Sequence, residues 1–183
     1  IDAGHGGKDG TTRGLNHSEK ELALQTALNL GKAIEAELKD VKVIYTRTTD
    51  EFIPLYERIE IANKAKADLF ISIHCNSNKS TRPYGASVHI LGPKSKNKNN
   101  QKDYFEVSQS VARRENSVIL LEEDHETTYQ GFDPDSPESV ISHNLMWNAN
   151  YSNSLLFASE VDVVFGKTPF RASNYTGIHQ DTF

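Results

Sequence analysis

Apolar residues recur every three or four positions at two places in the first half of the chain, and this spacing predicts two amphipathic helices. The first is expected over about 19–39, where one face is formed by Ala23, Ala27, Leu30, Ile34 and Leu38. Ser18-Glu19-Lys20-Glu21 has the S-x-x-E form of a capping box, so Glu19 is expected in the first helical turn. The second helix is expected to begin at Pro54, with an apolar face formed by Leu55, Ile59 and Ala62.

Short runs rich in β-branched and apolar residues predict strands before, between and after these helices. The run 41–46 is β-branched, and the near-continuous apolarity of 69–73 is typical of a strand buried on both faces of a parallel sheet. Further strands are expected at 84–91 and from Ile178 onward. The order strand, helix, strand, helix, strand predicts an α/β fold with a mostly parallel, twisted sheet and helices on both faces.

The pattern is interrupted between residues 92 and 138, which we expect to form an inserted segment of loops and one helix. Lysines and asparagines dominate its beginning, and acidic residues with glycine and prolines dominate its end. Between these polar stretches, one narrow apolar stripe predicts a short helix: Val107, Val111, Val118 and Leu121. A longer helix is expected from Ser139 to about Phe165. The whole chain is expected to form a single domain that carries this insertion.

Composition sets limits on the function. The chain has 183 residues, of which 37% are hydrophobic and 25% charged, as in an ordinary globular domain. Its net charge of −5 gives no electrostatic reason to expect nucleic acid as a partner. No apolar run approaches the roughly 20 residues of a membrane-spanning helix. The chain begins inside the first predicted strand, so we expect an upstream segment, and the missing signal peptide does not indicate a cytoplasmic protein.

Two histidines and one glutamate lie at the edges of predicted elements and are candidate metal ligands. His5 lies among glycines after a short apolar start, Glu19 projects from a first helical turn, and His74 follows the predicted strand 69–73. Two imidazoles and a carboxylate form a three-ligand zinc set that leaves a fourth position for water. The neighbouring Cys75 is expected to be a buried, unreactive thiol, because adjacent strand residues point to opposite faces.

Four motifs that contain these residues carry a resemblance to a known family. IDAGHGGKD, SEKELAL, TRTTD and LYERIEIANKAKADLFISIHCNS, in that order, resemble the zinc-dependent N-acetylmuramoyl-L-alanine amidases of bacterial cell walls. The resemblance covers most of 1–91 and resumes near Ser139. It implies that residues 1–183 form an amidase catalytic domain, with zinc at His5, Glu19 and His74. The implied reaction is hydrolysis of the amide between N-acetylmuramic acid and L-alanine in peptidoglycan, in the periplasm or outside the cell.

Two further expectations come from this resemblance. The family's general-base glutamate follows the last strand, so the catalytic glutamate and the end of the domain are expected beyond Phe183. VARREN at 111–116 resembles the division-associated amidases of Gram-negative bacteria, in which an inserted helix covers the zinc cleft and holds the enzyme inactive. The resemblance therefore implies that 92–138 is regulatory, that an activator protein displaces it, and that an inhibitory carboxylate contacts zinc. The candidates are Glu122, Glu123 and Glu126, with Glu115 as a further one.

Three alternatives stay open at this point. A module that lacks the general base would be a zinc-containing, non-catalytic peptidoglycan-binding module. A zinc carboxypeptidase of related architecture would need an arginine for its substrate's carboxylate, and Arg47 and Arg58 are the candidates. The inserted segment has the simpler interpretation of a solvated surface excursion. Stem-peptide specificity, the identity of an activator and the oligomeric state are not predicted by these residues.

Overall fold

The structure is a computed structural model of the chain. It describes residues 1–9, 14, 16–75, 85–91, 117–122, 150–167 and 178–181. The predicted helical residues 107–116, the first part of the long helix at 139–149 and most of the inserted segment lie outside the described residues. The chain divides into two units, one formed by 1–77 with 118–128 and the other by 78–117 with 129–183.

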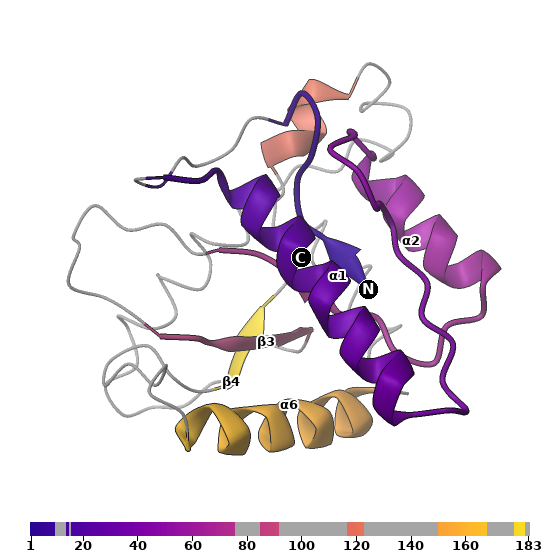
Figure 1. The fold of residues 1–183 in the computed structure, drawn as a ribbon, viewed down its shortest axis with the longest axis vertical. Helices are drawn as coiled ribbons and strands as arrows, with labels where there is room; N and C mark the ends of the chain where they lie inside the picture. Colours follow the sequence, from indigo (N-terminus) through magenta and orange to yellow (C-terminus); the bar gives the residue numbers. More distant parts are fainter. Residues whose placement is uncertain are drawn as a thin grey trace, which may run out of the picture. The chain divides into compact units, whose positions relative to one another are not determined.

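The first unit contains a parallel strand pair with one helix packed on it. Strand β1 (Asp2–Ala3) pairs in parallel with β2 (Ser72–Ile73), so that Asp2 lies opposite Ser72. Helix α1 (Glu19–Glu37) packs against both strands, and α2 (Leu55–Lys64) follows it in the chain (Figure 1). The parallel pairing confirms the α/β class that the element order predicted.

Helix α1 packs on the strands through its smallest residues. It begins where predicted, and the Ser18 amide and hydroxyl both donate to the Glu21 carboxylate at 2.9 Å. Its buried positions include Ala23, Ala27 and Gly31, where an added Cβ would overlap the Tyr45 hydroxyl. The larger residues of the predicted stripe are less covered, and Leu38 is 50% exposed. Small side chains therefore bring the helix axis close to the sheet.

Two predicted strands are shorter than expected or absent. Only Ser72 and Ile73 of the run 69–73 pair with β1, and Leu69 and Phe70 are 49% and 44% exposed rather than buried. No regular strand forms over 41–46, although Ile1 bonds the backbone at Ile44 and Thr46. Both runs form backbone hydrogen bonds with residues 1–4 of the chain.

Helix α2 buries a different face from the one that the sequence predicted. Pro54 directly precedes the helix, as a proline near a helix start should. Ile59 belongs to the predicted apolar face but is 58% exposed, whereas the Arg58 side chain beside it is buried. The polar partner of Arg58 explains this rotation, since its guanidinium forms an ion pair with the buried Asp2 carboxylate at 2.7 Å.

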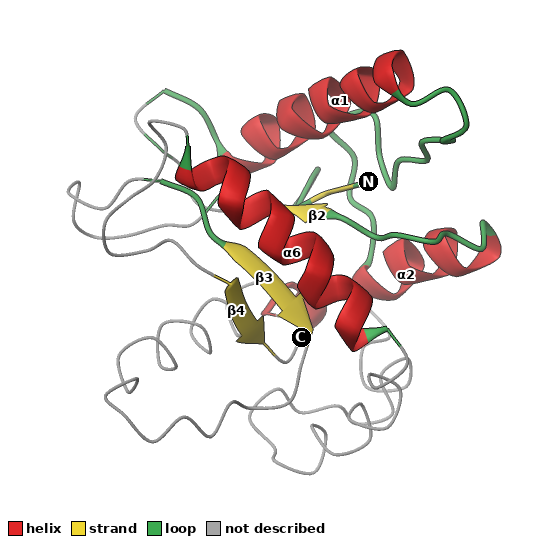
Figure 2. Cartoon of the chain, turned by 90° about the horizontal axis from the view of Figure 1, so that it is seen from below, coloured by secondary structure: helices red, strands yellow, loops and turns green. Residues whose placement is uncertain are grey.

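The second unit repeats the arrangement of a parallel pair and a helix. Strand β3 (Val88–Leu91) pairs in parallel with β4 (Ile178–Asp181), and α6 (Tyr151–Gly166) packs against both (Figure 2). Ala158 of α6 is fully buried. The strand predicted from Ile178 is confirmed over 178–181, whereas the strand predicted over 84–91 is observed only at 88–91. A helix forms in the second half of the predicted long helix, but it begins at Tyr151 with Asn150 as its N-cap, so the prediction of one continuous helix from Ser139 was wrong at this point.

The described part of the inserted segment contains a short 3₁₀ helix, η1 (Ser117–Leu121). Its Val118 and Ile119 are buried, so this part of the insertion packs on the protein.

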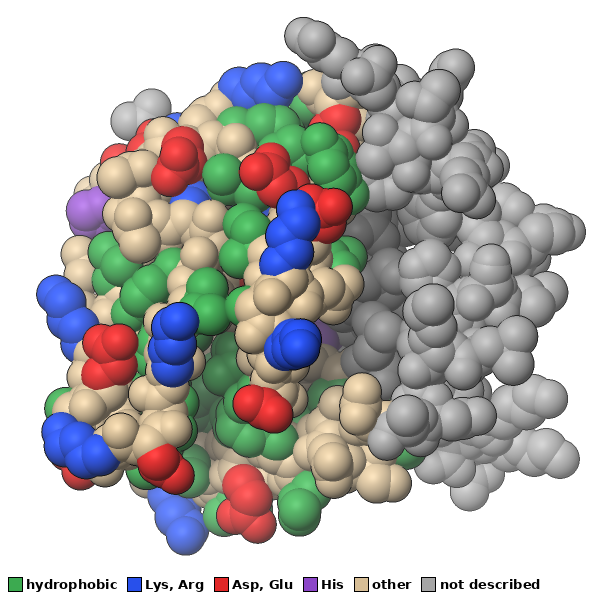
Figure 3. All heavy atoms as spheres, turned by 90° about the vertical axis from the view of Figure 1, so that its right-hand side faces the viewer, with side chains coloured by type: hydrophobic (Ala, Val, Ile, Leu, Met, Phe, Trp, Pro, Cys, Tyr) green, Lys and Arg blue, Asp and Glu red, His purple; other side chains and the backbone are tan. Residues whose placement is uncertain are grey.

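Figure 3 shows acidic and basic side chains interspersed with apolar ones on the face that it draws. Among the described residues, no helix is long and apolar enough to cross a membrane.

The Asp2 carboxylate connects four segments of the first unit. Its oxygens accept hydrogen bonds from Arg58 Nη1 at 2.7 Å, Thr46 Oγ1 at 2.7 Å and Ser72 Oγ at 2.6 Å. Burial alone would raise the pKa of Asp2, but the Arg58 charge and these hydrogen bonds outweigh burial and hold the pKa below its usual value. Asp2 is therefore ionised in the folded protein.

Replacement of Asp2 by alanine is expected to lower the free energy of unfolding at pH 7 by about 3–5 kcal/mol, because it leaves the buried Arg58 charge uncompensated. The folded-state pKa of Asp2 is lowered, so its stabilisation is present above the ordinary value of 3.8 and is lost as the pH falls through the folded pKa. The difference in the free energy of unfolding between the parent and Asp2→Ala should therefore become smaller in acid. Denaturant unfolding at pH 7 and below pH 3.8 measures it.

A matched control removes an ion pair that is exposed. Glu60→Gln breaks the surface pair with Lys64 and should leave the unfolding midpoint unchanged. An Asp2→Ala protein as stable as its parent at pH 7 would contradict the role given to this carboxylate.

Candidate metal centre

The backbone that carries His5 is held by two buried arginines. Arg47 donates from Nε to Ala3 O at 2.9 Å and from Nη2 to Gly4 O at 2.7 Å. Arg58 donates from Nη1 to Ala3 O and from Nη2 to His5 O, both at 2.8 Å. These contacts supply donors to consecutive carbonyls of an irregular segment, where strand pairing ends. The arginines are thus loop anchors, which argues against the carboxypeptidase interpretation.

The glycines after His5 permit a turn that most residues cannot make. His5 itself has a φ of 59°, in the left-handed region, and Gly6 and Gly7 have φ values of 131° and 54°. An added Cβ at Gly6 would overlap the Glu51 carbonyl oxygen. Asp50 accepts a hydrogen bond from the Gly7 amide at 2.8 Å and fixes the far side of the turn. The sequence HGGKD therefore folds into a tight turn.

Glu19 and His74 come from the two elements next to this loop. Glu19 is the first residue of α1 and is 3% exposed, and Arg47 ties the helix start to the loop by donating to Lys20 O at 2.9 Å. His74 directly follows β2, where parallel strands present ligands. Its imidazole lies against Gly4, since a Cβ added there would overlap the ring. Glycine at position 4 is therefore required by the His74 ring.

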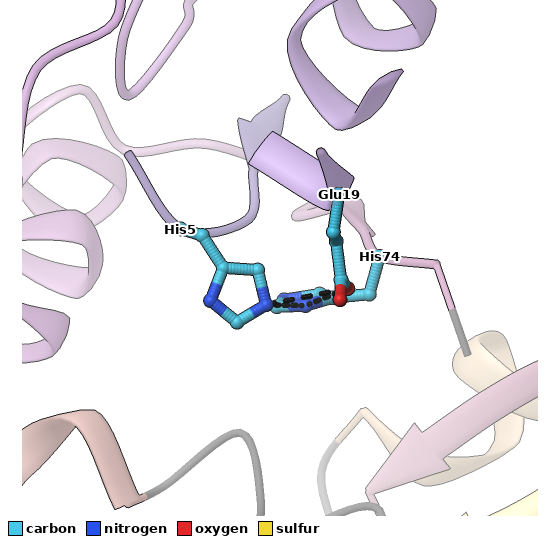
Figure 4. Close-up of side chains that lie close together, drawn as sticks. All are labelled: His5, Glu19 and His74. Carbon is cyan, nitrogen blue, oxygen red and sulfur yellow. Dashed lines mark hydrogen bonds and ion pairs between the residues drawn. The ribbon is translucent and has the colours of Figure 1, made fainter. Parts of the chain in front are cut away.

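Three ligand-type atoms converge on one point (Figure 4). His5 Nε2 lies 3.2 Å from Glu19 Oε1 and 3.2 Å from His74 Nδ1, and the His74 to Glu19 distance is 3.5 Å. Bonds of about 2.0–2.1 Å to zinc in tetrahedral geometry require ligand separations of about 3.3–3.4 Å. The three observed separations fit one face of such a tetrahedron. Among the described residues, these three form a group that can hold a metal ion.

The electrostatics of the group also fit a cation. Burial alone would raise the pKa of Glu19, but the contacts with the His5 and His74 imidazoles and the hydrogen bond from the Cys75 amide outweigh burial and lower the pKa to about 2. Within the described part of the chain, its buried Oε2 atom has no hydrogen-bond partner. An ionised carboxylate oxygen and two imidazole nitrogens that face one another within 3.5 Å are donor atoms that a divalent cation can bind.

Asp9 is a member of this site that the sequence analysis missed. Its Oδ2 lies 2.8 Å from His5 Nδ1, on the opposite side of the imidazole from Glu19. Asp9 is 8% exposed. The signal was present in the motif HGGKD, because a carboxylate four residues after the histidine can return to it through a turn built on two glycines.

The remaining predicted residues have other positions. Glu122 lies after η1, and its Oε1 accepts a hydrogen bond from the Leu55 amide at the start of α2 at 3.0 Å. It is not in the group of three metal-type residues. Glu115, Glu123 and Glu126 lie outside the described residues. Cys75 is half-buried rather than buried, and its amide donates to Glu19 Oε1 at 2.8 Å.

Comparison with known proteins gives one family and several relatives. The profile of the N-acetylmuramoyl-L-alanine amidase family matches residues 1–162. The chain is 44% identical over 95 residues to the amidase AmiC of Escherichia coli O6:H1, covering 51% of this chain and 22% of AmiC. It is 45% identical over 92 residues to AmiA of Salmonella typhimurium, covering 50% of this chain and 31% of AmiA. The chain thus spans less than a third of these relatives.

One solved structure among those that are similar is the catalytic domain of CwlV, an N-acetylmuramoyl-L-alanine amidase from Bacillus (Paenibacillus) polymyxa var. colistinus. The similarity covers 60% of this chain and 58% of that chain, with 29% sequence identity and a TM-score of 0.46.

The substitution Gly4→Ala should separate the ligand-type atoms without removing any of them. The new Cβ would overlap the His74 imidazole and displace it from His5. The affinity for a divalent metal should fall by about 10-fold or more, as expected when the orientation of a ligand is lost. Isothermal titration of the metal-free protein with zinc measures this.

The control is Gly14→Ala, where the nearest heavy atom is a backbone oxygen at 3.2 Å and no ligand is touched. Equal affinities for parent and Gly4→Ala would contradict the packing argument.

Proposed function

The chain belongs to the N-acetylmuramoyl-L-alanine amidase family, and we propose that it hydrolyses the amide bond between N-acetylmuramic acid and L-alanine in peptidoglycan. The observation that carries this proposal is the convergence of His5 Nε2, Glu19 Oε1 and His74 Nδ1 within 3.2–3.5 Å of one another. Peptidoglycan as substrate places the protein in the cell envelope, in the periplasm or outside the cell.

His5, Glu19 and His74 are proposed to hold a zinc ion and to leave one coordination position open. When bound there, zinc would supply Lewis-acid chemistry for the scissile carbonyl and for the attacking water. The residues of the chain keep this site in shape. Arg47 and Arg58 fix the backbone under His5, and the Cys75 amide orients the Glu19 carboxylate.

Amide hydrolysis also needs a base that takes a proton from water and passes it to the leaving amine. Glu19 is held by two histidines and an amide, and Asp9 is held by His5 on the far side of the imidazole. Glu19 therefore serves as a ligand and Asp9 as the partner of the ligand His5, and neither is proposed as the base. We propose that proton transfer uses the family's general-base glutamate, which the resemblance predicts after Phe183.

The first test of the proposal is metal content and activity in the full-length protein. His5→Ala and His74→Ala each remove one of three protein ligands and should lose most of the bound zinc and nearly all release of stem peptide from purified peptidoglycan. His89→Ala is the matched control, because His89 lies on β3 in the other unit and contacts Ser87. Mass-spectrometric zinc analysis and chromatography of released peptides give the two readouts.

Two results would point elsewhere. Full zinc occupancy in His5→Ala or His74→Ala would refute the ligand assignment. A zinc-loaded, full-length parent protein that binds peptidoglycan without releasing peptide would replace the enzyme by the alternative, a non-catalytic zinc-containing peptidoglycan-binding module.

The finer proposal is that the inserted segment 92–138 restrains the enzyme until an activator protein displaces it. Its described part, 117–122, contacts the elements around the site. Lys8, three residues after His5, donates from Nζ to Leu121 O at 3.1 Å, and Glu122 Oε1 accepts from the Leu55 amide at 3.0 Å. Val118 and Ile119 are buried beside these contacts. The described part of the insertion, 117–122, is therefore attached next to the His5 loop through these contacts.

Loosening this attachment should raise basal activity. Glu122→Ala removes the acceptor for the Leu55 amide and is expected to increase basal peptide release several-fold with zinc content unchanged. Glu60→Gln, which changes an exposed carboxylate of the same helix α2, is the control. Replacement of residues 94–136 by a glycine–serine linker should have the larger effect. Unchanged or lower rates in both folded variants would make the segment a solvated surface excursion.

A further inference from the structure

Asp9 reaches His5 through a turn that the sequence specifies locally. The Asp9 amide donates to Gly6 O at 3.1 Å, and the left-handed conformations of Gly6 and Gly7 reverse the chain between them. This turn carries the Asp9 carboxylate back to His5 Nδ1 at 2.8 Å. The Asp9 side chain is 11% exposed and that of His5 is 7% exposed, so little water competes for this contact. The Asp9–His5 contact is therefore formed by the backbone conformation of the loop.

His5 has a carboxylate beside each ring nitrogen, because Asp9 Oδ2 lies 2.8 Å from Nδ1 and Glu19 Oε1 lies 3.2 Å from Nε2. A neutral imidazole has one N–H group and one lone pair, and an ionised carboxylate can only accept a hydrogen bond. The shorter contact, with Asp9, favours the proton of His5 on Nδ1. The lone pair then lies on Nε2, the atom 3.2 Å from both Glu19 Oε1 and His74 Nδ1. Metal binding requires this tautomer.

We propose that Asp9 is a positioning residue that fixes the tautomer and the ring orientation of His5 for metal binding. This inference rests on the proposed zinc site and adds a residue that acts through His5 rather than on the substrate. Carboxylates that accept from the second nitrogen of a metal-bound histidine raise the basicity of the ligand and hold its ring in place. Asp9 should therefore raise the affinity of the site for zinc.

A simpler role for Asp9 would be to hold the loop closed, and Asp50 serves as the comparison. Asp50 bonds the same loop at the Gly7 amide, and its other oxygen accepts from Lys20 Nζ at 2.7 Å. Its contacts are with the backbone and a lysine, whereas Asp9 contacts the imidazole itself. If loop closure alone mattered, the two carboxylates would have equivalent effects on the site.

The test compares Asp9→Ala, Asp9→Asn and Asp50→Asn in the full-length protein. Long-range ¹H–¹⁵N NMR correlations of the metal-free protein report the His5 tautomer, and competition with a chromophoric chelator gives the zinc affinity. Asp9→Ala should shift His5 away from the Nδ1–H tautomer and weaken zinc binding about 10- to 100-fold. Asp9→Asn keeps the shape of the side chain and should give a smaller loss, because an amide can accept or donate. Asp50→Asn should leave the His5 tautomer unchanged.

The Asn variant keeps the test valid if Asp9→Ala fails to fold. The proposal is overturned if His5 keeps the Nδ1–H tautomer in the folded Asp9 variants, or if their zinc affinity stays within about twofold of the parent. It is also overturned if Asp50→Asn causes the same losses as Asp9→Asn. Failure of the parent protein to bind zinc would refute the proposed function, whereas the tautomer measurement would still decide what Asp9 does to His5.

Discussion

The site depends on two buried guanidinium groups that satisfy a short stretch of backbone where strand pairing ends. Arg47 and Arg58 together donate to the carbonyl oxygens of Ala3, Gly4 and His5. Without these donors, the carbonyls would be buried and unpaired, at a cost of about 1–3 kcal/mol each. Arg58 is itself neutralised by Asp2, which also bonds Thr46 and Ser72. One buried charge pair thus holds the strand, the loop and α2 in register.

This backbone, fixed by the two arginines, brings three polar side chains within 3.5 Å of one another. Glu19 is placed by the first turn of α1, His74 by the end of β2, and His5 by a residue with positive φ. The strained φ of His5 costs about 1 kcal/mol and is tolerated because Arg58 fixes the carbonyl of His5 on one side and Asp9 its imidazole on the other. Hydrogen bonds within the chain therefore hold His5 in place, and such orientation of a ligand favours tight and selective binding.

The sequence predicted the parts of the site that depend on local rules. The capping box placed Glu19 at a helix start, glycines marked the His5 turn, and the end of the predicted strand 69–73 marked His74, whereas the meeting of the three was implied by the family resemblance. Arg47 and Arg58 were named only as candidates for a substrate carboxylate, and Asp9 was missed, because hydrogen bonds between residues distant in the sequence or across a turn leave no periodic pattern. For the same reason the apolar face predicted for α2 was wrong at Ile59: the Asp2–Arg58 pair, rather than apolar burial, sets the orientation of α2.

The central claim is that His5, Glu19 and His74 together bind one zinc ion. The most direct measurement is an anomalous difference map from crystals of the zinc-loaded, full-length protein, recorded on both sides of the zinc absorption edge. We predict one strong peak in contact with His5 Nε2, His74 Nδ1 and the Glu19 carboxylate, with His5 Nδ1 still bonded to Asp9. A zinc peak that lies elsewhere, or the absence of any peak between these three side chains, would contradict the account.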